Sequence, residues 1–432
     1  MTQTRTIHPA AGMSGEIVVP GDKSISHRSI MLGSLAEGTT IVRGFLHGED
    51  NHATLNAFRN MGVSIEELAD GVLRIEGKGL DGLVEPSDVI DCGNSGTTIR
   101  LMTGLLAGQA FFSVLSGDRY LRKRPMKRVV GPLASMGARI WGRRGGDLAP
   151  LAIQGGGLKA TAYDSPIASA QVKSALLLAG LYADGGTTVR EPHLSRDHSE
   201  RMLAYFGADV RPFPGGVSVT GRPRLTGREV QVPGDISSAA FFMVAALITP
   251  GSELLIRNVG VNPTRSGIVD ILRAMGGNLE LLNEREVSGE PVADVLVRSS
   301  ALRGIEIGGD VVPRAIDEFP VISVAAAFAE GTTVIRDARE LRVKETDRIS
   351  AMTSELNRLG GKVEAREDGM VIEGGEGLAG GNVSSHGDHR IAMSMAVAAL
   401  RAAAPVTIDD TECTATSFPN FWELLDSVRG EA

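Results

Sequence analysis

Three short stretches of the chain combine hydroxyl groups, small residues and a nearby cation where a helix is expected to begin. They are GDKSISHR at residues 21–28, GNSGTTIR at residues 93–100 and SAQVK at residues 169–173. The N–H groups and the positive dipole end of a helix N-terminus attract phosphates and carboxylates. Ser, Asp and Asn are also ordinary helix caps, which explains any one stretch taken alone. Their recurrence predicts a site that binds anions.

The first stretch carries the strongest signal for function. It lacks the GxxxxGK[ST] pattern of a nucleotide-binding loop, so it does not indicate ATP binding. Lys23 would add a point charge, and Arg28 can bind a carboxylate through two parallel hydrogen bonds. A cation in the first turn opposes the helix dipole, so a purely structural role would be costly. In the second stretch, Gly96 allows a ligand to approach the backbone closely.

Other cations lie near expected helix starts. Residues 119–128 hold six of them, for which a solvated charged helix is the common explanation, although Arg124 precedes Pro125 just outside a helix start. Arg196 precedes the helix expected after the stretch RDHSE, residues 196–200. An exposed helix start would explain His198 and Glu200. The chain contains no HExxH or related zinc spacing, and we expect no metal ligand among the site residues.

The acid–base candidates lie in the last third of the chain. Asp317 precedes a largely apolar stretch, so its carboxylate is expected at the edge of a core, where partial burial raises a carboxylate pKa and favours a role as base. The stretch KETDR, residues 344–348, places two acids and two bases at another helix start. A capping network of solvated charges is its simpler explanation. At residues 388–390, DHR has the equally simple explanation of a cap beside an exposed Arg.

These residues belong to a repeat of about 70 residues that occurs six times. Its first half is an apolar helix with a polar opening, often followed by Gly-Thr-Thr and a β-branched strand. Its second half is an amphipathic helix that ends on a bulky apolar residue and Gly, because Gly adopts the left-handed conformation of a helix C-terminus. These ends are Met61-Gly62, Met136-Gly137, Phe206-Gly207, Met275-Gly276 and Leu359-Gly360.

A four-residue motif that occurs twice predicts the domain boundary. The phrase Val-Pro-Gly-Asp occurs at residues 19–22 and again at residues 232–235, with three repeats between and three after. We therefore expect a domain of residues 21–232 inserted into a discontinuous domain of residues 1–20 and 233–432. The chain would cross between the domains twice.

Composition agrees with a two-domain protein of the cytoplasm. The chain has 432 residues, of which 42% are apolar, and a net charge of −8 without a long block of one sign. This argues against nucleic-acid and membrane partners. No apolar stretch has the length of a membrane span, and the N-terminus lacks the pattern of a secretory signal. Only two cysteines occur, Cys92 and Cys413, which is typical of reduced thiols rather than a disulfide framework.

Taken in order, the stretches GDKSISHR, GNSGTTIR, KRP, SAQVK, PGDISSA, RVKETDR, GDHR and ATSFP closely resemble the 5-enolpyruvylshikimate-3-phosphate (EPSP) synthase family. The resemblance runs along nearly the whole chain. It implies an α/β fold of two similar domains, each made of three βαβαββ repeats in an inside-out α/β barrel, with the active site in the interdomain cleft. It also implies a monomer without a cofactor. Residues 196–200 and 262–265 resemble class II members, several of which tolerate glyphosate.

The implied reaction is transfer of the enolpyruvyl group of phosphoenolpyruvate to the 5-hydroxyl of shikimate-3-phosphate with release of phosphate, a step of the shikimate pathway toward chorismate and the aromatic amino acids. By matching positions, Asp317 is the base, and Lys23 or Glu345 protonates the methylene group and later removes a proton. The residues implied to bind shikimate-3-phosphate are Ser24, Arg28, Ser169, Gln171, Arg196 and Lys344. Those implied for phosphoenolpyruvate are Lys23, Gly96, Arg124, Gln171, Arg348, His389 and Arg390, and Asn94 and Ala170 complete the substrate-binding set.

One position departs from the family pattern, and two rival functions stay open. Thr416 stands where class I members carry a Lys that contacts phosphoenolpyruvate, so it is not included in the site. The UDP-N-acetylglucosamine enolpyruvyl transferases have a similar fold but carry a Cys shortly before the matching Arg-Pro, and residues 116–123 contain none. A protein that only binds phosphometabolites would not need Asp317, Lys23 or Glu345. Phosphate release with each acceptor distinguishes the three.

Overall fold

The computed structural model describes residues 3–431, and in it the chain repeats the order strand, helix, strand, helix, strand, strand. The first helix of each repeat begins where the polar openings predict. These helices are α1 (Lys23–Leu35), α3 (Gly96–Ala107), α6 (Ala170–Gly180), α8 (Ile236–Ile248), α11 (Phe319–Phe328) and α13 (His389–Ala399). They are apolar on nearly all faces because they lie inside the protein: every residue of α8 is buried.

Side-chain caps explain why five of these helices begin where they do. The N-cap side chain accepts a hydrogen bond from a backbone N–H of the first turn, which satisfies a donor that has no partner within the helix. The five capping residues are Asp22, Ser95, Ser169, Asp235 and Asp388. The sixth, Glu318 before α11, makes no such bond and instead accepts a hydrogen bond from the hydroxyl of Ser237 on α8.

The second helix of each repeat ends as the glycines predict. These helices are α2 (Glu49–Asn60), α4 (Lys127–Ser135), α7 (His198–Phe206), α9 (Gly267–Ala274), α12 (Arg348–Arg358) and α14 (Phe421–Val428). The first five are followed within two residues by a glycine in the left-handed region, with φ between 83° and 105°. That conformation strains a residue with a side chain, so glycine stops the helix and turns the chain toward the next strand.

Four repeats form the same four-stranded mixed sheet, in which the first two strands are parallel and the others antiparallel. The four sheets are β14-β3-β5-β4, β6-β7-β9-β8, β10-β11-β13-β12 and β18-β19-β21-β20. Their strands are β3 (Glu37–Arg43), β4 (Ser64–Glu67), β5 (Leu73–Lys78), β6 (Ile90–Asp91), β7 (Phe112–Ser116), β8 (Arg139–Gly142), β9 (Leu148–Gln154), β10 (Ala162–Asp164), β11 (Gly186–Arg190), β12 (Val210–Phe213), β13 (Gly216–Thr220), β14 (Glu229–Gln231), β18 (Glu306–Ile307), β19 (Gly331–Ile335), β20 (Lys362–Arg366) and β21 (Gly369–Gly374).

The remaining strands form two further sheets that join the chain ends to the fourth and sixth repeats. Their orders are β16-β17-β15-β2-β24 and β1-β23-β22. Their strands are β1 (Arg5–Ile7), β2 (Ala10–Val18), β15 (Glu253–Gly260), β16 (Asn278–Val287), β17 (Glu290–Arg298), β22 (Gly381–Val383), β23 (Val406–Ile408) and β24 (Arg429–Glu431). The predicted α/β class with six βαβαββ repeats is therefore confirmed.

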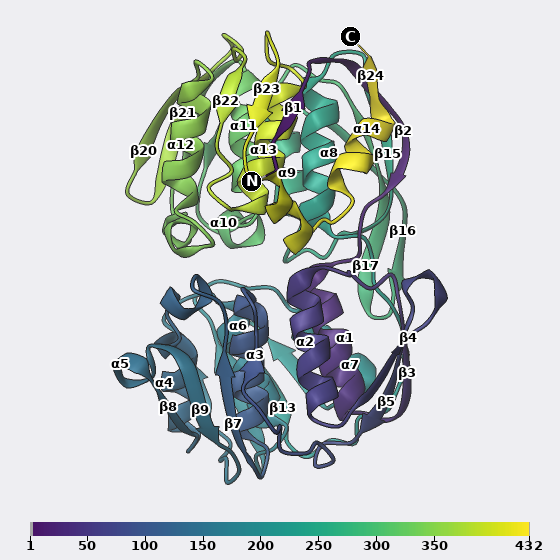
Figure 1. The fold of residues 1–432 in the computed structure, drawn as a ribbon, viewed down its shortest axis with the longest axis vertical. Helices are drawn as coiled ribbons and strands as arrows, with labels where there is room; N and C mark the ends of the chain where they lie inside the picture. The colour runs from purple at the N-terminus through teal and green to yellow at the C-terminus, as the bar shows by residue number, and fades with distance from the viewer. Residues whose placement is uncertain (1–2, 432) are drawn as a thin grey trace. The chain divides into compact units, whose positions relative to one another are not determined.

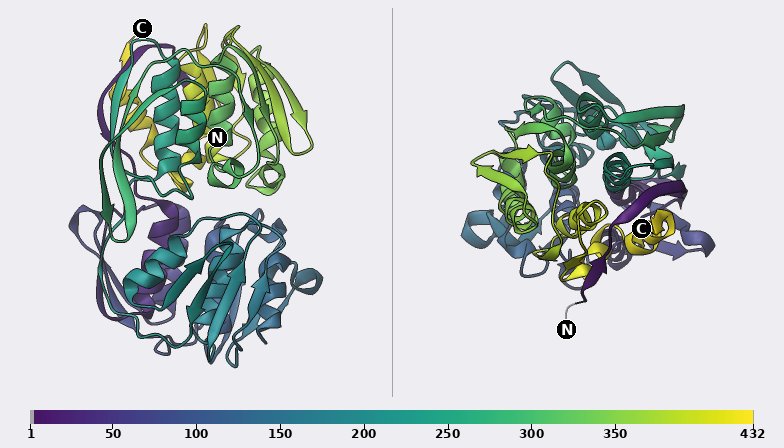
Figure 2. Two further views of the ribbon diagram at one scale, coloured as in Figure 1. Left: turned by 180° about the vertical axis from the view of Figure 1, so that it is seen from behind. Right: turned by 90° about the horizontal axis from the view of Figure 1, so that it is seen from above.

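The chain divides into two compact units. The first contains residues 1–20, 233–286 and 291–432, and the second contains residues 21–232 together with 287–290, the turn between β16 and β17. In the first unit α8, α11 and α13 pack against one another, with β20 and β21 on one side and β2 and β15 on the other (Figure 1; seen from behind and from above in Figure 2). In the second, α3 packs against both α1 and α6. Each unit has its own apolar core.

Candidate active site

Lys23 opens α1 in the second unit and is held by the first turn of α2. Its Nζ lies 2.5 Å from Oδ2 of Asp50, and the amide of Asn51 donates to its backbone oxygen at 3.1 Å. Asp50 supplies the negative charge that offsets a cation at a helix N-terminus. This partner could not be predicted from the sequence, because 27 positions separate the two residues and only the packing of α1 on α2 brings them together.

Arg28, one turn further along α1, is buried and fixed by three hydrogen bonds. Its Nε donates to the hydroxyl of Ser199 at 2.7 Å, its Nη2 to the hydroxyl of Ser174 at 2.8 Å and its Nη1 to the backbone oxygen of Ser24 at 2.9 Å. Burial, together with the charge of Arg196, lowers the pKa of Arg28 to about 10, although nearby carboxylates such as Glu200 oppose this shift. The guanidinium still carries its charge at neutral pH, in a geometry set by three different segments.

Two guanidiniums flank the start of α3. Asn94 accepts a hydrogen bond from Nη2 of Arg124 at 3.0 Å, just before the cap residue Ser95. A Cβ atom placed on Gly96 would lie 3.1 Å from an Nη1 of both Arg100 and Arg124, closer than side chains usually pack. Only glycine leaves these two cations their present positions. The atoms nearest to this position belong to two cationic side chains, and the approach of a ligand to the backbone at Gly96 stays a prediction.

The amide of Gln171, on the first turn of α6, has a defined orientation. Its Oε1 accepts from Nη1 of Arg100 at 2.7 Å, and its Nε2 donates to the hydroxyl of Thr97 at 3.2 Å. Arg100 is itself anchored on the backbone oxygen of Pro125 at 3.1 Å. Arg100 thus positions a predicted substrate-binding residue, a role that the sequence did not indicate.

A buried lysine organises the segment around Ser169 and Arg196. Lys173, with a 2% exposed side chain, lies 2.9 Å from Glu191 and 2.8 Å from Glu200. Burial alone would lower the pKa of Lys173, but the two carboxylates raise it above its usual value. Glu191 in turn accepts from the backbone N–H of Ser169 at 3.1 Å, and Lys173 donates to the backbone oxygen that precedes Arg196 at 3.2 Å.

The interpretation of His198 and Glu200 as parts of an exposed helix start is wrong. His198 is 2% and Glu200 is 8% exposed, since α7 packs on α1 through this face. Nδ1 of His198 lies 2.7 Å from Oε1 of Glu290, and Glu200 pairs with Lys173. Polar residues at a helix start are typical of solvent exposure. Only the packing shows that His198 and Glu200 are buried and that each has a partner inside the unit.

Asp317 lies at the centre of the cluster in the first unit. Its Oδ1 lies 3.0 Å from Nζ of Lys344 and 3.5 Å from Nη1 of Arg348, and its side chain is 14% exposed. Nη1 of Arg390 donates to its backbone oxygen at 3.1 Å. The expected position at the edge of a core agrees with this burial. The two cations beside this carboxylate were not part of the expectation.

Arg348 connects the acidic residues around Asp317. Its side chain is 1% exposed, its Nε lies 2.8 Å from Oδ2 of Asp388 and its Nη2 lies 2.7 Å from Oε2 of Glu345. Burial alone would lower the pKa of Arg348, but the charges of Asp388, Glu345 and Asp317 raise it above its usual value. Conversely, burial would raise the pKa of Asp388, and Arg348 holds it below its usual range.

The capping explanations are right for the aspartates and wrong for the arginines. Asp347 caps α12 by accepting from the backbone N–H of Ser350 at 3.1 Å, and Asp388 caps α13 by accepting from that of Arg390 at 2.9 Å. Arg348 and Arg390, however, are buried rather than solvated. His389, also buried, has its Nδ1 3.9 Å from Oδ1 of Asp388.

The predicted residues therefore form two groups, one in each unit. The second unit holds Lys23, Ser24, Arg28, Asn94, Gly96, Arg124, Ser169, Ala170, Gln171 and Arg196, and the first holds Asp317, Lys344, Glu345, Arg348, His389 and Arg390. Most lie at or next to the start of a helix, where backbone N–H groups add to the positive charge of the cations. The group in the second unit is suited to binding anions. The group in the first unit also contains carboxylates, which can accept a proton.

Comparison with known proteins gives a single answer. The model of the family described as EPSP synthase (3-phosphoshikimate 1-carboxyvinyltransferase) matches residues 7–425. The 3-phosphoshikimate 1-carboxyvinyltransferase of Syntrophotalea carbinolica is 73% identical over 429 residues, covering 99% of this chain and 100% of the relative. That of Geotalea uraniireducens is 71% identical over 426 residues, covering 99% of each chain. A solved structure of EPSP synthase from Acinetobacter baumannii is similar with a TM-score of 0.89 and 51% identity, covering 99% of this chain and 98% of that one.

Proposed function

Because the chain belongs to the EPSP synthase (3-phosphoshikimate 1-carboxyvinyltransferase) family, we propose that its two groups of residues act on the same pair of substrates. The chain is a 3-phosphoshikimate 1-carboxyvinyltransferase of the shikimate pathway, with phosphoenolpyruvate and shikimate-3-phosphate as substrates. It transfers the enolpyruvyl group to the 5-hydroxyl of shikimate-3-phosphate and releases phosphate. This step leads to chorismate and the aromatic amino acids.

We assign shikimate-3-phosphate to a set that combines serine hydroxyls, an amide and three cations. Arg28 supports this assignment because its guanidinium is fixed by Ser24, Ser174 and Ser199 before any ligand arrives. Preorganised donors lose little entropy on binding. The full set consists of Ser24, Arg28, Ser169, Gln171, Arg196 and Lys344.

We assign phosphoenolpyruvate to a more strongly cationic set. The two guanidiniums beside Gly96 support this assignment, since a ligand with a phosphate and a carboxylate needs several cations close together. The set consists of Lys23, Gly96, Arg124, Gln171, Arg348, His389 and Arg390, with Asn94 orienting Arg124 and Ala170 contributing its backbone N–H.

The proposed mechanism is addition followed by elimination. Asp317 removes the proton of the 5-hydroxyl as the oxygen attacks the central carbon of phosphoenolpyruvate, and Lys23 or Glu345 delivers a proton to the methylene carbon. The tetrahedral intermediate then loses a proton from the methyl group and expels phosphate, which regenerates the double bond. Cations fixed in place before the reaction stabilise the charge that develops, without reorganising at that moment.

The observation that carries this proposal is the geometry of Asp317, whose carboxylate lies 3.0 Å from Lys344 and 3.5 Å from Arg348. Asp317→Asn preserves the shape and removes the base. Turnover should fall by about two to four orders of magnitude while shikimate-3-phosphate still binds. Steady-state rates and calorimetric titration measure the two properties, and near-normal turnover would remove Asp317 from the mechanism.

The acceptor specificity is tested by following inorganic phosphate. The protein is incubated with phosphoenolpyruvate and either shikimate-3-phosphate or UDP-N-acetylglucosamine. We expect release with the first acceptor only. Release with the sugar nucleotide, or with neither acceptor, would contradict the proposal.

We also propose that the enzyme acts as a cytoplasmic monomer. Each unit has its own core, so neither needs a second copy to bury its apolar residues. Across residues 3–431, no helix has the length and apolar character needed to cross a membrane. Light scattering coupled to gel filtration and fractionation of the source cells test the two statements. A stable dimer or recovery with the membrane fraction would overturn one or the other.

A further inference from the structure

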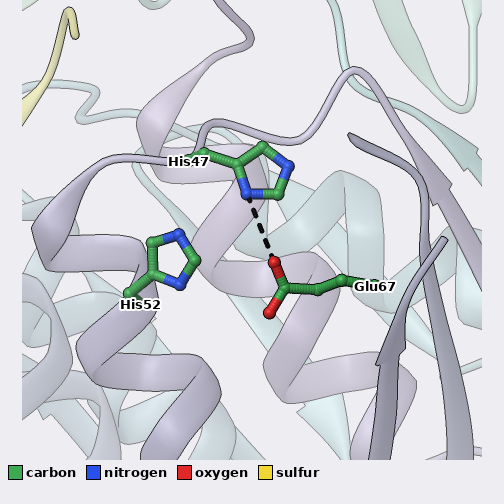
Figure 3. Close-up of side chains that lie close together, drawn as sticks. All are labelled: His47, His52 and Glu67. Carbon is green, nitrogen blue, oxygen red and sulfur yellow. Dashed lines mark ion pairs between the residues drawn. The ribbon is translucent and has the colours of Figure 1, made fainter. Parts of the chain in front are cut away.

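Two histidines and a glutamate of the second unit, none of them assigned to a substrate, lie close together. His47 lies in the loop between β3 and α2, His52 lies in the first turn of α2, and Glu67 is the last residue of β4. One ligand atom from each lies within 4.8 Å of the other two, and Figure 3 shows the imidazoles and the carboxylate pointing toward one another. Two imidazoles and a carboxylate are a donor set that binds Zn²⁺ in proteins.

The orientation of His47 favours a metal ion over a simple contact with Glu67. Nε2 of His47 lies 3.3 Å from the backbone oxygen of Gly71, so this nitrogen carries the hydrogen and donates it. Nδ1, the other ring nitrogen, faces Oε2 of Glu67 at 3.8 Å, which is longer than a direct hydrogen bond. A ligating histidine commonly donates its other N–H to a backbone carbonyl, as this one does.

Glu67 is positioned in a similar way. Its Oε1 lies 3.2 Å from Nη2 of Arg59, which is itself anchored on the backbone oxygen of Ile65 at 2.7 Å. The carboxylate thus directs one oxygen toward Arg59 and the other, Oε2, toward His47. An outer partner of this kind fixes a carboxylate ligand and leaves the second oxygen for the ion.

The ring of Phe45 packs against both histidines, including His52, the third ligand. Phe45 is 5% exposed and its ring meets the edge of both imidazoles, with centroid distances of 5.1 Å to His47 and 6.4 Å to His52. The outer side of the cluster is open, since the side chains of His47 and Glu67 are 35% and 38% exposed. An ion can therefore enter from solvent, while packing restricts the rings.

We propose that His47, His52 and Glu67 bind a divalent transition-metal ion of the Zn²⁺ type, with water as the fourth ligand. Ligand atoms at about 2.0–2.2 Å from a tetrahedral ion lie about 3.3–3.6 Å apart. Nδ1 of His47 and Oε2 of Glu67 are 3.8 Å apart, close to this range, and the ligand atoms of all three residues lie within 4.8 Å of one another. We expect side-chain rotations to close the remaining gap when an ion binds.

The test is titration of the purified full-length protein with Zn²⁺ in competition with a chromophoric chelator, together with the visible spectrum of the Co²⁺ form. We expect one ion per chain and the absorption of tetrahedral Co²⁺. His47→Ala and Glu67→Gln should each weaken binding by at least about tenfold, the loss that disturbing a metal site typically causes. The control is His8→Ala, which removes an exposed histidine outside the cluster and should leave affinity unchanged.

The thermal unfolding midpoint of each variant without metal shows whether that variant is folded. We expect all three to fold, because His47, Glu67 and His8 are not buried. Equal Zn²⁺ affinity in the wild-type protein and His47→Ala would overturn the proposal. So would a loss in His8→Ala as large as in the cluster variants, because the bound ion would then be held by surface histidines in general.

Discussion

Among single residues, Lys173 shows how a side chain that touches no substrate in our assignment can still matter for binding. It forms ion pairs with Glu191 and Glu200, and it donates to the backbone oxygen just before Arg196. Glu191 also fixes the backbone of Ser169. Lys173 therefore connects two residues assigned to shikimate-3-phosphate, and we regard it as a positioning residue.

Lys173→Met should consequently be both less stable and a weaker binder. The change leaves two buried carboxylates without their cation, a situation that typically costs about 3–5 kcal/mol. We expect a lower unfolding midpoint and a KM for shikimate-3-phosphate that rises more than the KM for phosphoenolpyruvate. Denaturant unfolding and steady-state kinetics measure both. If both KM values rose equally, Lys173 would have only a general structural role.

Gly96 leaves space beside the guanidiniums of Arg100 and Arg124. In Gly96→Ala the new methyl would lie 3.1 Å from the Nη1 atoms of Arg100 and Arg124, so these side chains must move by a few tenths of an ångström. We expect glyphosate to compete with phosphoenolpyruvate in the unmodified protein. Because glyphosate is longer, the variant should bind it at least about tenfold more weakly while the KM for phosphoenolpyruvate changes less, as a clash with one ligand discriminates between similar anions.

The matched control is Gly131→Ala on α4, where a Cβ would meet no atom within 4 Å. It should leave both constants unchanged. Inhibition and Michaelis constants of the three proteins decide the matter. An equal loss for glyphosate and phosphoenolpyruvate in Gly96→Ala would show that this position does not control selectivity.

Among the elements, the first turn of α2 serves two different sites. Asp50 and Asn51 contact Lys23, and His52 belongs to the proposed metal site. Successive residues of a helix point in different directions, so one turn can present its side chains to the interior and to the surface at once. The position of Lys23 therefore depends on an element that starts 26 residues later in the chain.

Asp50→Asn tests this dependence. The amide keeps the size of the side chain but loses the charge that holds Nζ of Lys23 at 2.5 Å. We expect kcat/KM for phosphoenolpyruvate to fall by about tenfold, or about 1.4 kcal/mol of transition-state stabilisation. Glu49→Gln, at an exposed position of the same turn, is the control and should have no effect. Unchanged kinetics in Asp50→Asn would mean that Lys23 is positioned without this carboxylate.

The element scale also shows what the sequence could predict. Helix openings and ends were predictable because caps such as Ser95 and left-handed glycines such as Gly62 act within one or two turns of chain. The partners of the site residues were not, because Asp50, Glu200 and Asp388 reach their cations through the packing of different helices. The same reason hid the cluster of His47, His52 and Glu67, which has none of the spacings of known zinc motifs.

For the whole molecule, the division into two units follows the chain closely. The second unit begins at Gly21 and its main segment ends at Val232, next to the two Val-Pro-Gly-Asp phrases. All buried residues of its core lie between Ile25 and Val232, and its three sheets contain no strand from outside this range. It therefore contains everything that its own core requires.

We predict that a protein consisting of residues 21–232 folds by itself, because a segment of this length with a complete core buries enough apolar surface to be stable. It lacks the bond between His198 and Glu290, so its unfolding midpoint should be lower than that of the intact enzyme. Circular dichroism and cooperative urea unfolding test this expectation. A chain without cooperative unfolding would show that the second unit depends on the first.

The same fragment retains Arg28 and Arg196 but not Lys344, so calorimetry should detect shikimate-3-phosphate binding that is weaker than in the full enzyme. Binding as tight as in the full enzyme would exclude Lys344 from the site, and this measurement therefore tests the assignment of one substrate to residues of both units.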